Sequence, residues 1–222
     1  MPYVFDVYGT LLDVDAAARE AAEGHPALAK SWPQLSMMWR QRQLSYSWLR
    51  SLMQRYVPFW QITTEALDVT LDEMGLKDDD LRQSLLNLYL ELSAYDEVPD
   101  ILARLKSQGQ PLAVLSNGDP DMLDAALKSA GIDHLLDAVL SVDTLQCYKP
   151  DPRVYALVTD HFGCSAADVT FFSSNNWDVA GAGSFGFNTV WVNRGGKVWD
   201  DLPKPPGQVA LSITDAVRDI AP

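Results

Sequence analysis

The sequence has few cysteines, little positive charge and no long hydrophobic run, and each shortage excludes a class of protein. Its two cysteines, Cys147 and Cys164, show neither CxxC nor cysteine–histidine spacing, so we predict neither a disulfide scaffold nor a zinc site. No apolar run approaches the roughly 18 residues that cross a membrane. Residues 3–7 are apolar but include an acid, and they lack the basic leader of a signal peptide. We therefore expect a cytoplasmic protein with reduced thiols.

The chain is also strongly acidic. It carries 17 Lys and Arg residues against 30 Asp and Glu residues, which gives a formal net charge of −13. A surface of this sign repels phosphate backbones and anionic lipids, so we expect neither a nucleic-acid partner nor a membrane partner. Any site for an anion must be a local pocket that supplies its own cations and backbone amides.

The hydrophobic pattern predicts one α/β core with a helical insertion. Residues 3–7 form a buried apolar and aromatic strand, whereas residues 15–92 show helical spacing, as in Met37, Leu44, Trp48 and Leu52. After Pro99, strands and helices alternate. The strands are predicted at 111–115, 138–140, 169–172 and 189–192, and the helices at 101–108, 121–130, 152–162, after residue 173 and at 213–220. The expected fold is a doubly wound, Rossmann-like parallel sheet (residues 1–14 and 95–222) with an all-helical cap domain inserted at 15–94.

Polar side chains gather where the predicted strands end. Ligands of open parallel sheets bind beyond the carboxyl ends of the strands, and four segments occupy such places: 6–10, 116–117, 149–150 and 173–178. A carboxylate nucleophile needs a rigid support, nearby N–H donors and a cation. Asp6 at a strand end, the turn at Gly9 and the ammonium of Lys149 meet these needs, so we predict that Asp6 is the nucleophile.

Three other signals do not fit a function. Residues 181–186 match GxGxxG, but a dinucleotide-binding motif follows a strand directly and opens a helix, whereas this one ends a segment and precedes a strand. Packing of small residues explains it better. The three histidines are scattered without a nucleophile or metal partner, and Ser116 does not lie in a GxSxG elbow.

Taken together, four motifs resemble those of the haloacid dehalogenase superfamily in order and spacing: Asp6-Val7-Tyr8-Gly9-Thr10, Leu115-Ser116-Asn117-Gly118, Tyr148-Lys149-Pro150 and Ser173-Ser174-Asn175-Asn176-Trp177-Asp178. The resemblance spans essentially the whole chain. Trp39 to Leu44 and Trp48 to Arg50 resemble the helical cap of the L-2-haloacid dehalogenases in particular.

Departures from the phosphatases of this superfamily point to the same subfamily. A phosphatase carries a second aspartate two residues after the nucleophile, which protonates the leaving alkoxide, and here Tyr8 stands in that position. Its last motif carries acids that help to bind magnesium, and here serines and asparagines leave only Asp178. A halide leaving group needs no proton. We therefore expect a hydrolase without a metal or other cofactor.

The resemblance implies that Asp6 displaces halide from a short-chain L-2-haloalkanoic acid through an ester, with inversion to a D-2-hydroxy acid. The residues that match catalytic positions are Asp6, Thr10, Arg40, Lys149, Tyr155, Ser173, Asn175 and Asp178. Those that match substrate-binding positions are Tyr8, Leu11, Arg40, Gln41, Leu44, Phe59, Ser116, Asn117 and Trp177. Arg40 and Asn117 resemble halide acceptors, and Asp178 is the expected base. Ser116 and the backbone amides from Tyr8 to Leu11 would hold the carboxylate.

The sequence also fits other interpretations of these residues and of the function. Arg40 fits a surface arginine on a helix, and the aromatic residues fit ordinary core packing. A magnesium-dependent small-molecule phosphatase on the same fold is the second candidate function, and an anion-binding protein without catalysis is the third. The resemblance also implies a homodimer.

Overall fold

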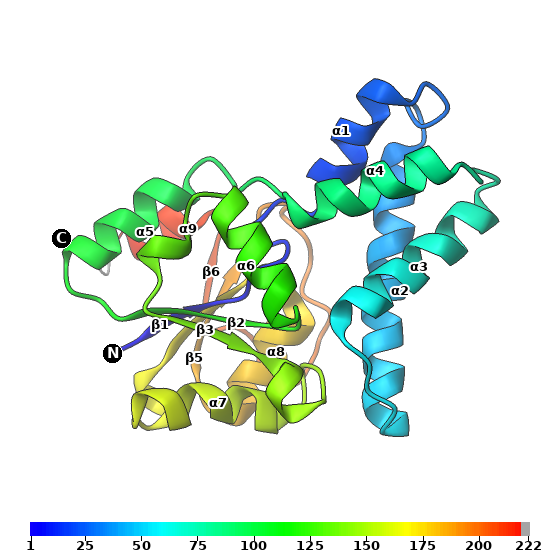
Figure 1. The fold of residues 1–222 in the computed structure, drawn as a ribbon. Coiled ribbons are helices and arrows are strands. Elements are labelled where there is room, and N and C mark those ends of the chain that lie inside the picture. The colour runs from blue at the N-terminus through cyan, green and yellow to red at the C-terminus, as the bar shows by residue number, and fades with distance from the viewer. Residues whose placement is uncertain (219–222) are drawn as a thin grey trace.

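The computed structural model describes residues 1–218 and contains one six-stranded parallel sheet (Figure 1). The strand order is β3-β2-β1-β4-β5-β6. The strands are β1 (Tyr3–Phe5), β2 (Leu112–Ser116), β3 (Ala138–Ser141), β4 (Thr170–Ser173), β5 (Asn188–Val192) and β6 (Gln208–Ala210). The predicted doubly wound α/β sheet is confirmed.

The central strand is β1, and it is buried throughout. Strands covered on both faces have near-continuous hydrophobic sequences, which is what residues 3–5 and 112–115 show. Phe5 pairs with Val114 on one side and with Phe172 on the other, and its ring stacks on Phe172 at 4.7 Å between centroids. The Asp6 amide then donates to the Phe172 carbonyl at 2.9 Å. Asp6 is therefore fixed at the carboxyl end of a rigid strand.

Helices cover both faces of the sheet (Figure 1). They are α5 (Val98–Ser107), α6 (Pro120–Ser129) and α9 (Ile213–Val217) on one face, with α7 (Pro152–Phe162) and α8 (Asn176–Phe185) on the other. Short 3₁₀ turns lie at Asp133–Leu135, Val142–Leu145 and Ala166–Asp168. The last predicted helix, 213–220, is observed as α9, and its final residues lie outside the described range.

The insertion after β1 is entirely helical, as predicted. It consists of α1 (Ala16–Gly24), α2 (Trp32–Met53), α3 (Phe59–Glu73) and α4 (Asp79–Leu90), which we call the cap. In Figure 1 the cap lies beyond the carboxyl ends of the strands. No helix within residues 1–218 is both long enough and apolar enough to cross a membrane.

The apolar spacing that predicts the helix α2 does not show which of its faces packs inward. Met37 and Leu52 are 53% and 81% exposed, so the stripe that they define does not form the core. Instead α2 buries Leu35, Trp39 and Gln43, spaced four residues apart. The helix carries apolar residues on both sides, so helical spacing alone could not show which side meets its neighbours.

One strand was missed and one motif was correctly rejected. β6 pairs with β5 through residues for which the sequence predicts no strand, because three residues at a sheet edge are too few to show an alternating pattern. Residues 181–186 lie in α8 and at its C-terminus, as expected for a packing motif. A Cβ on Gly181 would lie 2.4 Å from the Tyr155 hydroxyl and 2.7 Å from Pro150 Cβ. Glycine is needed there for close packing against the site.

Candidate active site

Asp6 is surrounded by four hydrogen-bond donors, which come from three of the four predicted segments. Lys149 Nζ lies 3.1 Å from Asp6 Oδ1. The other oxygen, Oδ2, accepts from Thr10 Oγ1 at 2.9 Å, Asn175 Nδ2 at 2.8 Å and Ser173 Oγ at 3.4 Å. Asp6 is only 5% exposed. These contacts hold an ionised carboxylate in one orientation, as a nucleophile requires.

Lys149 joins the two carboxylates of the site. Its side chain is completely buried, and Nζ contacts Asp178 Oδ2 at 2.8 Å as well as Asp6. Burial alone would lower the pKa of Lys149, but the charges of Asp178 and Asp6 raise the pKa above its usual value. Lys149 is therefore a permanent cation at neutral pH.

Asp178 lies in the first turn of α8 and is fully buried. Its Oδ1 accepts a hydrogen bond from the Tyr155 hydroxyl at 2.8 Å. Burial raises the pKa of Asp178 to about 6, although the Lys149 charge acts in the opposite direction. A carboxylate with this pKa is ionised at neutral pH and is basic enough to take a proton from water. The structure thus brings Asp6, Lys149, Asp178 and Tyr155 into one network, although Tyr155 comes from α7.

Two residues without a predicted role, Ser174 and Arg194, hold the turn after Asp6. Thr10 Oγ1 accepts from the Ser174 amide at 2.9 Å, and Ser174 Oγ donates to the Gly9 carbonyl at 2.7 Å. Gly9 has a φ of +86°, which only glycine adopts readily. Arg194 Nη2 donates to the Thr10 carbonyl at 3.0 Å and to Glu97 at 2.7 Å. Arg194 follows β5, so the strand-end rule was the signal that could have found it.

The structure restricts one predicted role, the binding of the substrate carboxylate by the backbone amides from Tyr8 to Leu11. The amides of Thr10 and Leu11 donate to the Val7 carbonyl at 3.2 and 2.9 Å, and the Gly9 amide donates to the Leu12 carbonyl at 2.8 Å. The turn is so tight that it satisfies these groups internally, so they do not offer a carboxylate-binding cradle. Of the amides from Tyr8 to Leu11, only that of Tyr8 stays a candidate. The Leu11 side chain is fully buried in the core.

Ser116 and Asn117 reach the site from the end of β2. Ser116 Oγ accepts from the Gly118 amide at 3.1 Å, which leaves the hydroxyl hydrogen of Ser116 available to donate. Asn117 Oδ1 accepts from the Lys149 amide at 3.0 Å, so its NH₂ group is the part that can meet an anion. Both residues are buried.

Arg40 approaches the same loop from α2. Its Nη1 donates to Gln43 Oε1 at 2.7 Å, and its Nη2 donates to the Tyr8 carbonyl at 3.3 Å. The side chain is half-buried and bonds across the cap–core boundary. These contacts do not fit a surface arginine that extends into solvent.

Aromatic residues of the cap pack against two residues of the predicted site, Tyr8 and Trp177. Tyr8 stacks on Tyr89 at 5.7 Å between ring centroids and lies 6.3 Å from Phe59. The buried Tyr8 hydroxyl has no hydrogen-bond partner within residues 1–218. Trp177 meets Trp48 edge to face at 5.4 Å. Tyr8 and Phe59 are therefore both core residues and neighbours of the site.

A cleft of about 770 Å³ opens between α2 and the loops that follow β4 and β5. Its lining includes five predicted residues, Arg40, Gln41, Leu44, Asn175 and Trp177, of which Asn175 contacts Asp6. The cleft therefore leads from solvent toward Asp6. Phe59, Ser116 and Asn117 do not line it and lie deeper.

Comparisons with known proteins agree with this geometry. Residues 3–186 match the family model of the haloacid dehalogenase-like hydrolases. The chain is 51% identical over 194 residues to (S)-2-haloacid dehalogenase 4A of Burkholderia cepacia, covering 87% of this chain and 83% of that protein. A dehalogenase crystal structure matches with a TM-score of 0.95 and 46% identity, covering 100% of this chain and 97% of the other.

A third relative is informative about chemistry. The structure of the L-2-haloacid dehalogenase from Xanthobacter autotrophicus with chloropropionic acid covalently bound matches with a TM-score of 0.88 and 36% identity, covering 99% of this chain and 97% of that chain. The family match covers well over half of the chain, and the relatives cover almost all of it. The chain belongs to the haloacid dehalogenase-like hydrolases.

Proposed function

We propose that this protein hydrolyses short-chain L-2-haloalkanoic acids to D-2-hydroxy acids through an ester of Asp6. The observation that carries the proposal is the environment of Asp6, a buried carboxylate held by Lys149 with Tyr8 where a phosphatase has its general acid. The similarity to named (S)-2-haloacid dehalogenases supports the same substrate class. The protein is thus a hydrolase of carbon–halide bonds.

In the first step an Asp6 carboxylate oxygen attacks the α-carbon opposite the halogen. A carbon–oxygen bond forms, the carbon–halogen bond breaks with its electron pair, and the centre inverts. The halide leaves as an anion and meets the guanidinium of Arg40 and the NH₂ group of Asn117. No proton is transferred, so the reaction does not need a general acid at the position of Tyr8. The Lys149 ammonium lies 3.1 Å from the Asp6 carboxylate and helps to hold it in place.

In the second step water opens the ester. Asp178 takes a proton from water, and the resulting hydroxide adds to the carboxyl carbon of Asp6. The acyl carbon–oxygen bond then breaks and Asp178 returns its proton to the product oxygen. The regenerated Asp6 carboxyl releases the other water proton to solvent. Tyr155 holds Asp178 in place, and Ser173 and Asn175 orient the ester, since both contact Asp6 Oδ2. The oxygen that the product gains comes from Asp6.

Substrate binding divides between two groups of residues. The Ser116 hydroxyl and the Tyr8 amide hold the carboxylate of the substrate, while Thr10 fixes the Asp6 rotamer. The apolar lining around the side chain of the substrate comprises Tyr8, Gln41, Leu44, Phe59 and Trp177. Leu11 packs behind these residues in the core. Local cations, Arg40 and Lys149, make an anion site possible on a chain of net charge −13.

We also propose the domain division 1–14 and 95–222 for the core and 15–94 for the cap. Its support is that the two connections lie side by side, with Tyr95 donating to the Leu11 carbonyl at 3.0 Å and Asp13 to the Ser93 carbonyl at 2.9 Å. The homodimer is proposed with the exposed apolar side of α2, which includes Met37, Leu49, Leu52 and Met53, as its interface. Sedimentation of a monomer alone would refute it. The cytoplasmic location stays a prediction from the sequence.

The function is tested by halide release from L- and D-2-chloropropionate in chelator, with a phosphate ester and magnesium in a parallel assay. We expect chloride from the L-isomer only. Phosphate release without chloride would mean that the protein is the alternative, a phosphatase. Ligand binding without turnover, unchanged in Asp6→Asn, would mean that it is no enzyme.

The ester is tested separately by a single turnover in heavy-oxygen water. Because water attacks Asp6 rather than the substrate, the D-2-hydroxy acid should be mainly unlabelled. Mostly labelled product would rule out the ester.

A further inference from the structure

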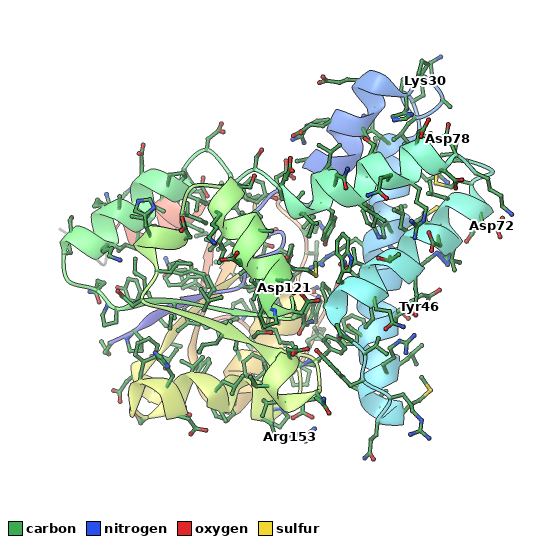
Figure 2. All side chains as sticks on the ribbon, in the orientation of Figure 1. Lys30, Tyr46, Asp72, Asp78, Asp121 and Arg153 are labelled. Carbon is green, nitrogen blue, oxygen red and sulfur yellow. The ribbon has the colours of Figure 1, made fainter. Side chains whose placement is uncertain are left out.

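Asp119 joins a helix of the core to a helix of the cap. It is the N-cap residue of α6, and its Oδ1 accepts from the Met122 amide at 3.2 Å. Its Oδ2 accepts from the Trp60 amide, the second residue of α3, at 2.9 Å. A single carboxylate, 8% exposed, thus serves the N-termini of two helices. The start of α6 lies beside the start of α3 in Figure 1, and Asp121 in that first turn is labelled in Figure 2.

The helix α3 has no capping side chain of its own. Pro58 precedes it and makes no side-chain cap. The first amides of a helix lack intrahelical acceptors and form the positive end of its dipole, so a carboxylate there is stabilising. Asp119 therefore supplies from the core what the local sequence of the cap does not provide.

Other contacts tie the segment before α3 to the same side of the core. The Tyr56 hydroxyl donates to Asp143 Oδ1 at 2.6 Å, and the Tyr148 hydroxyl donates to the Val57 carbonyl. Tyr148 directly precedes Lys149 in the chain. The α2–α3 connection is thus held by the loops that carry the catalytic residues, and Asp119 makes the contact to α3 itself.

The residue placed by these contacts is Phe59. It opens α3, is 1% exposed, and lies 6.3 Å from the Tyr8 ring and 5.7 Å from the Tyr148 ring. On the other side, Asp119 is two residues from Asn117, whose side chain accepts from the Lys149 amide. Asp119 thereby sets the position of the Phe59 ring relative to Asn117 and Lys149.

We propose that Asp119 is a positioning residue that holds Phe59 in the substrate pocket before the substrate binds. Its kinetic consequence rests on the proposed dehalogenase function. When Asp119 caps α3, the substrate meets a pocket that is already formed. Without that bond, part of the binding energy must organise α3, so KM rises while kcat at saturation is retained. General damage to the fold would instead lower the active fraction, and hence kcat, at an unchanged KM.

The test is Asp119→Ser. Serine is a good N-cap, so it keeps the local cap of α6, but its side chain is too short to serve α3 as well. The matched control is Asp78→Ser, which alters the N-cap of α4 at the end of the cap far from the core (Figure 2). The two measurements are amide hydrogen exchange at Trp60 and steady-state chloride release from L-2-chloropropionate.

For Asp119→Ser we expect at least about a tenfold loss of Trp60 amide protection and about a tenfold rise in KM, because a hydrogen bond to a charged acceptor is lost. The value of kcat should change by less than about threefold, since saturation restores the bound arrangement. Asp78→Ser should leave both the Trp60 protection and KM unchanged.

Unchanged Trp60 protection would overturn the proposal, and so would lost protection with a wild-type KM or a fall in kcat alone. If the serine variant does not fold, Asp119→Asn replaces it. Asparagine keeps the shape but has one acceptor oxygen instead of two, so either the Trp60 amide or the Met122 amide loses its acceptor, and exchange is followed at both. KM should rise only if Trp60 loses protection. Unchanged protection at both amides, or lost Trp60 protection with a wild-type KM, would overturn the proposal. Wild-type protein that releases no chloride would refute the proposed function, while the exchange at Trp60 would still decide whether Asp119 caps α3.

Discussion

The hydrogen bond from Tyr155 to Asp178 gives a quantitative prediction about pH dependence. Asp178 must be ionised to take a proton from water, so ester hydrolysis should slow as the pH falls through its pKa of about 6. The Tyr155 hydroxyl donates to Oδ1 at 2.8 Å and favours the ionised form, which lowers the pKa of Asp178. Tyr155→Phe removes that donor but keeps the ring, which packs edge to face against Phe171 at 6.1 Å.

The size of the shift follows from the energy of the bond. A hydrogen bond to a charged group contributes about 1.5–3 kcal/mol, and one pKa unit corresponds to about 1.4 kcal/mol. Loss of the hydroxyl should therefore raise the pKa of Asp178 by about 1–2 units, which moves the acidic limb to about pH 7–8. The sign is fixed because destabilising the carboxylate favours its protonated form.

The assay separates the two chemical steps. In a single turnover, chloride release reports ester formation, and the appearance of the D-2-hydroxy acid reports ester hydrolysis. In Tyr155→Phe the acidic limb of the second rate should move to higher pH, while the first rate keeps its wild-type profile. Tyr46→Phe, on α2 in the cap (Figure 2), is the matched control and should change neither. An acidic limb that stays near pH 6, or that moves lower, would refute the assignment of Asp178 as the base.

Three further predictions follow from the site. Arg40→Ala should cost about 2–4 kcal/mol of transition-state stabilisation in kcat/KM, and a near-wild-type value would remove Arg40 from the mechanism. Lys149→Met should lower the free energy of unfolding in urea at pH 8 by about 3–5 kcal/mol, because two buried carboxylates lose their cation; a loss below about 1 kcal/mol would contradict this. Gly181→Ala should lower Tm by several degrees, because the added Cβ would overpack against Tyr155. In Gly183→Ala the atom nearest to the added Cβ lies at 3.3 Å, so this variant should have an unchanged or higher Tm. Equal changes of Tm in the two variants would contradict the packing argument.

Much of the fold could be predicted because its signals are local. Strands such as 112–115 are buried on both faces and therefore consist almost entirely of apolar residues, whatever their neighbours are. The long helical segment after β1 was equally clear. β6 was not, because three residues at a sheet edge become a strand only through backbone pairing with β5.

The positions of the proposed catalytic residues could be predicted because the carboxyl ends of parallel strands share one edge of the sheet. That rule placed Asp6, Asn117, Lys149 and Asp178 together before their distances were known, and the structure confirms that they meet. The sequence could not show that the turn after Asp6 engages its own amides. Turn amides are donors in any sequence, and only the folded backbone decides which carbonyl each one meets.

The sequence by itself therefore determined the sheet, the insertion and the segments that carry the chemistry, because periodicity and strand ends are properties of short stretches. Only the tertiary structure decided which face of α2 packs inward, that Arg194 and Ser174 hold the nucleophile turn, and that Asp119 caps a helix of the cap. The physical reason is that these contacts join residues far apart in the chain, 59 residues in the case of Asp119 and Trp60. A hydrogen bond of that kind depends on how the packed elements meet, and no local pattern of residue types specifies it.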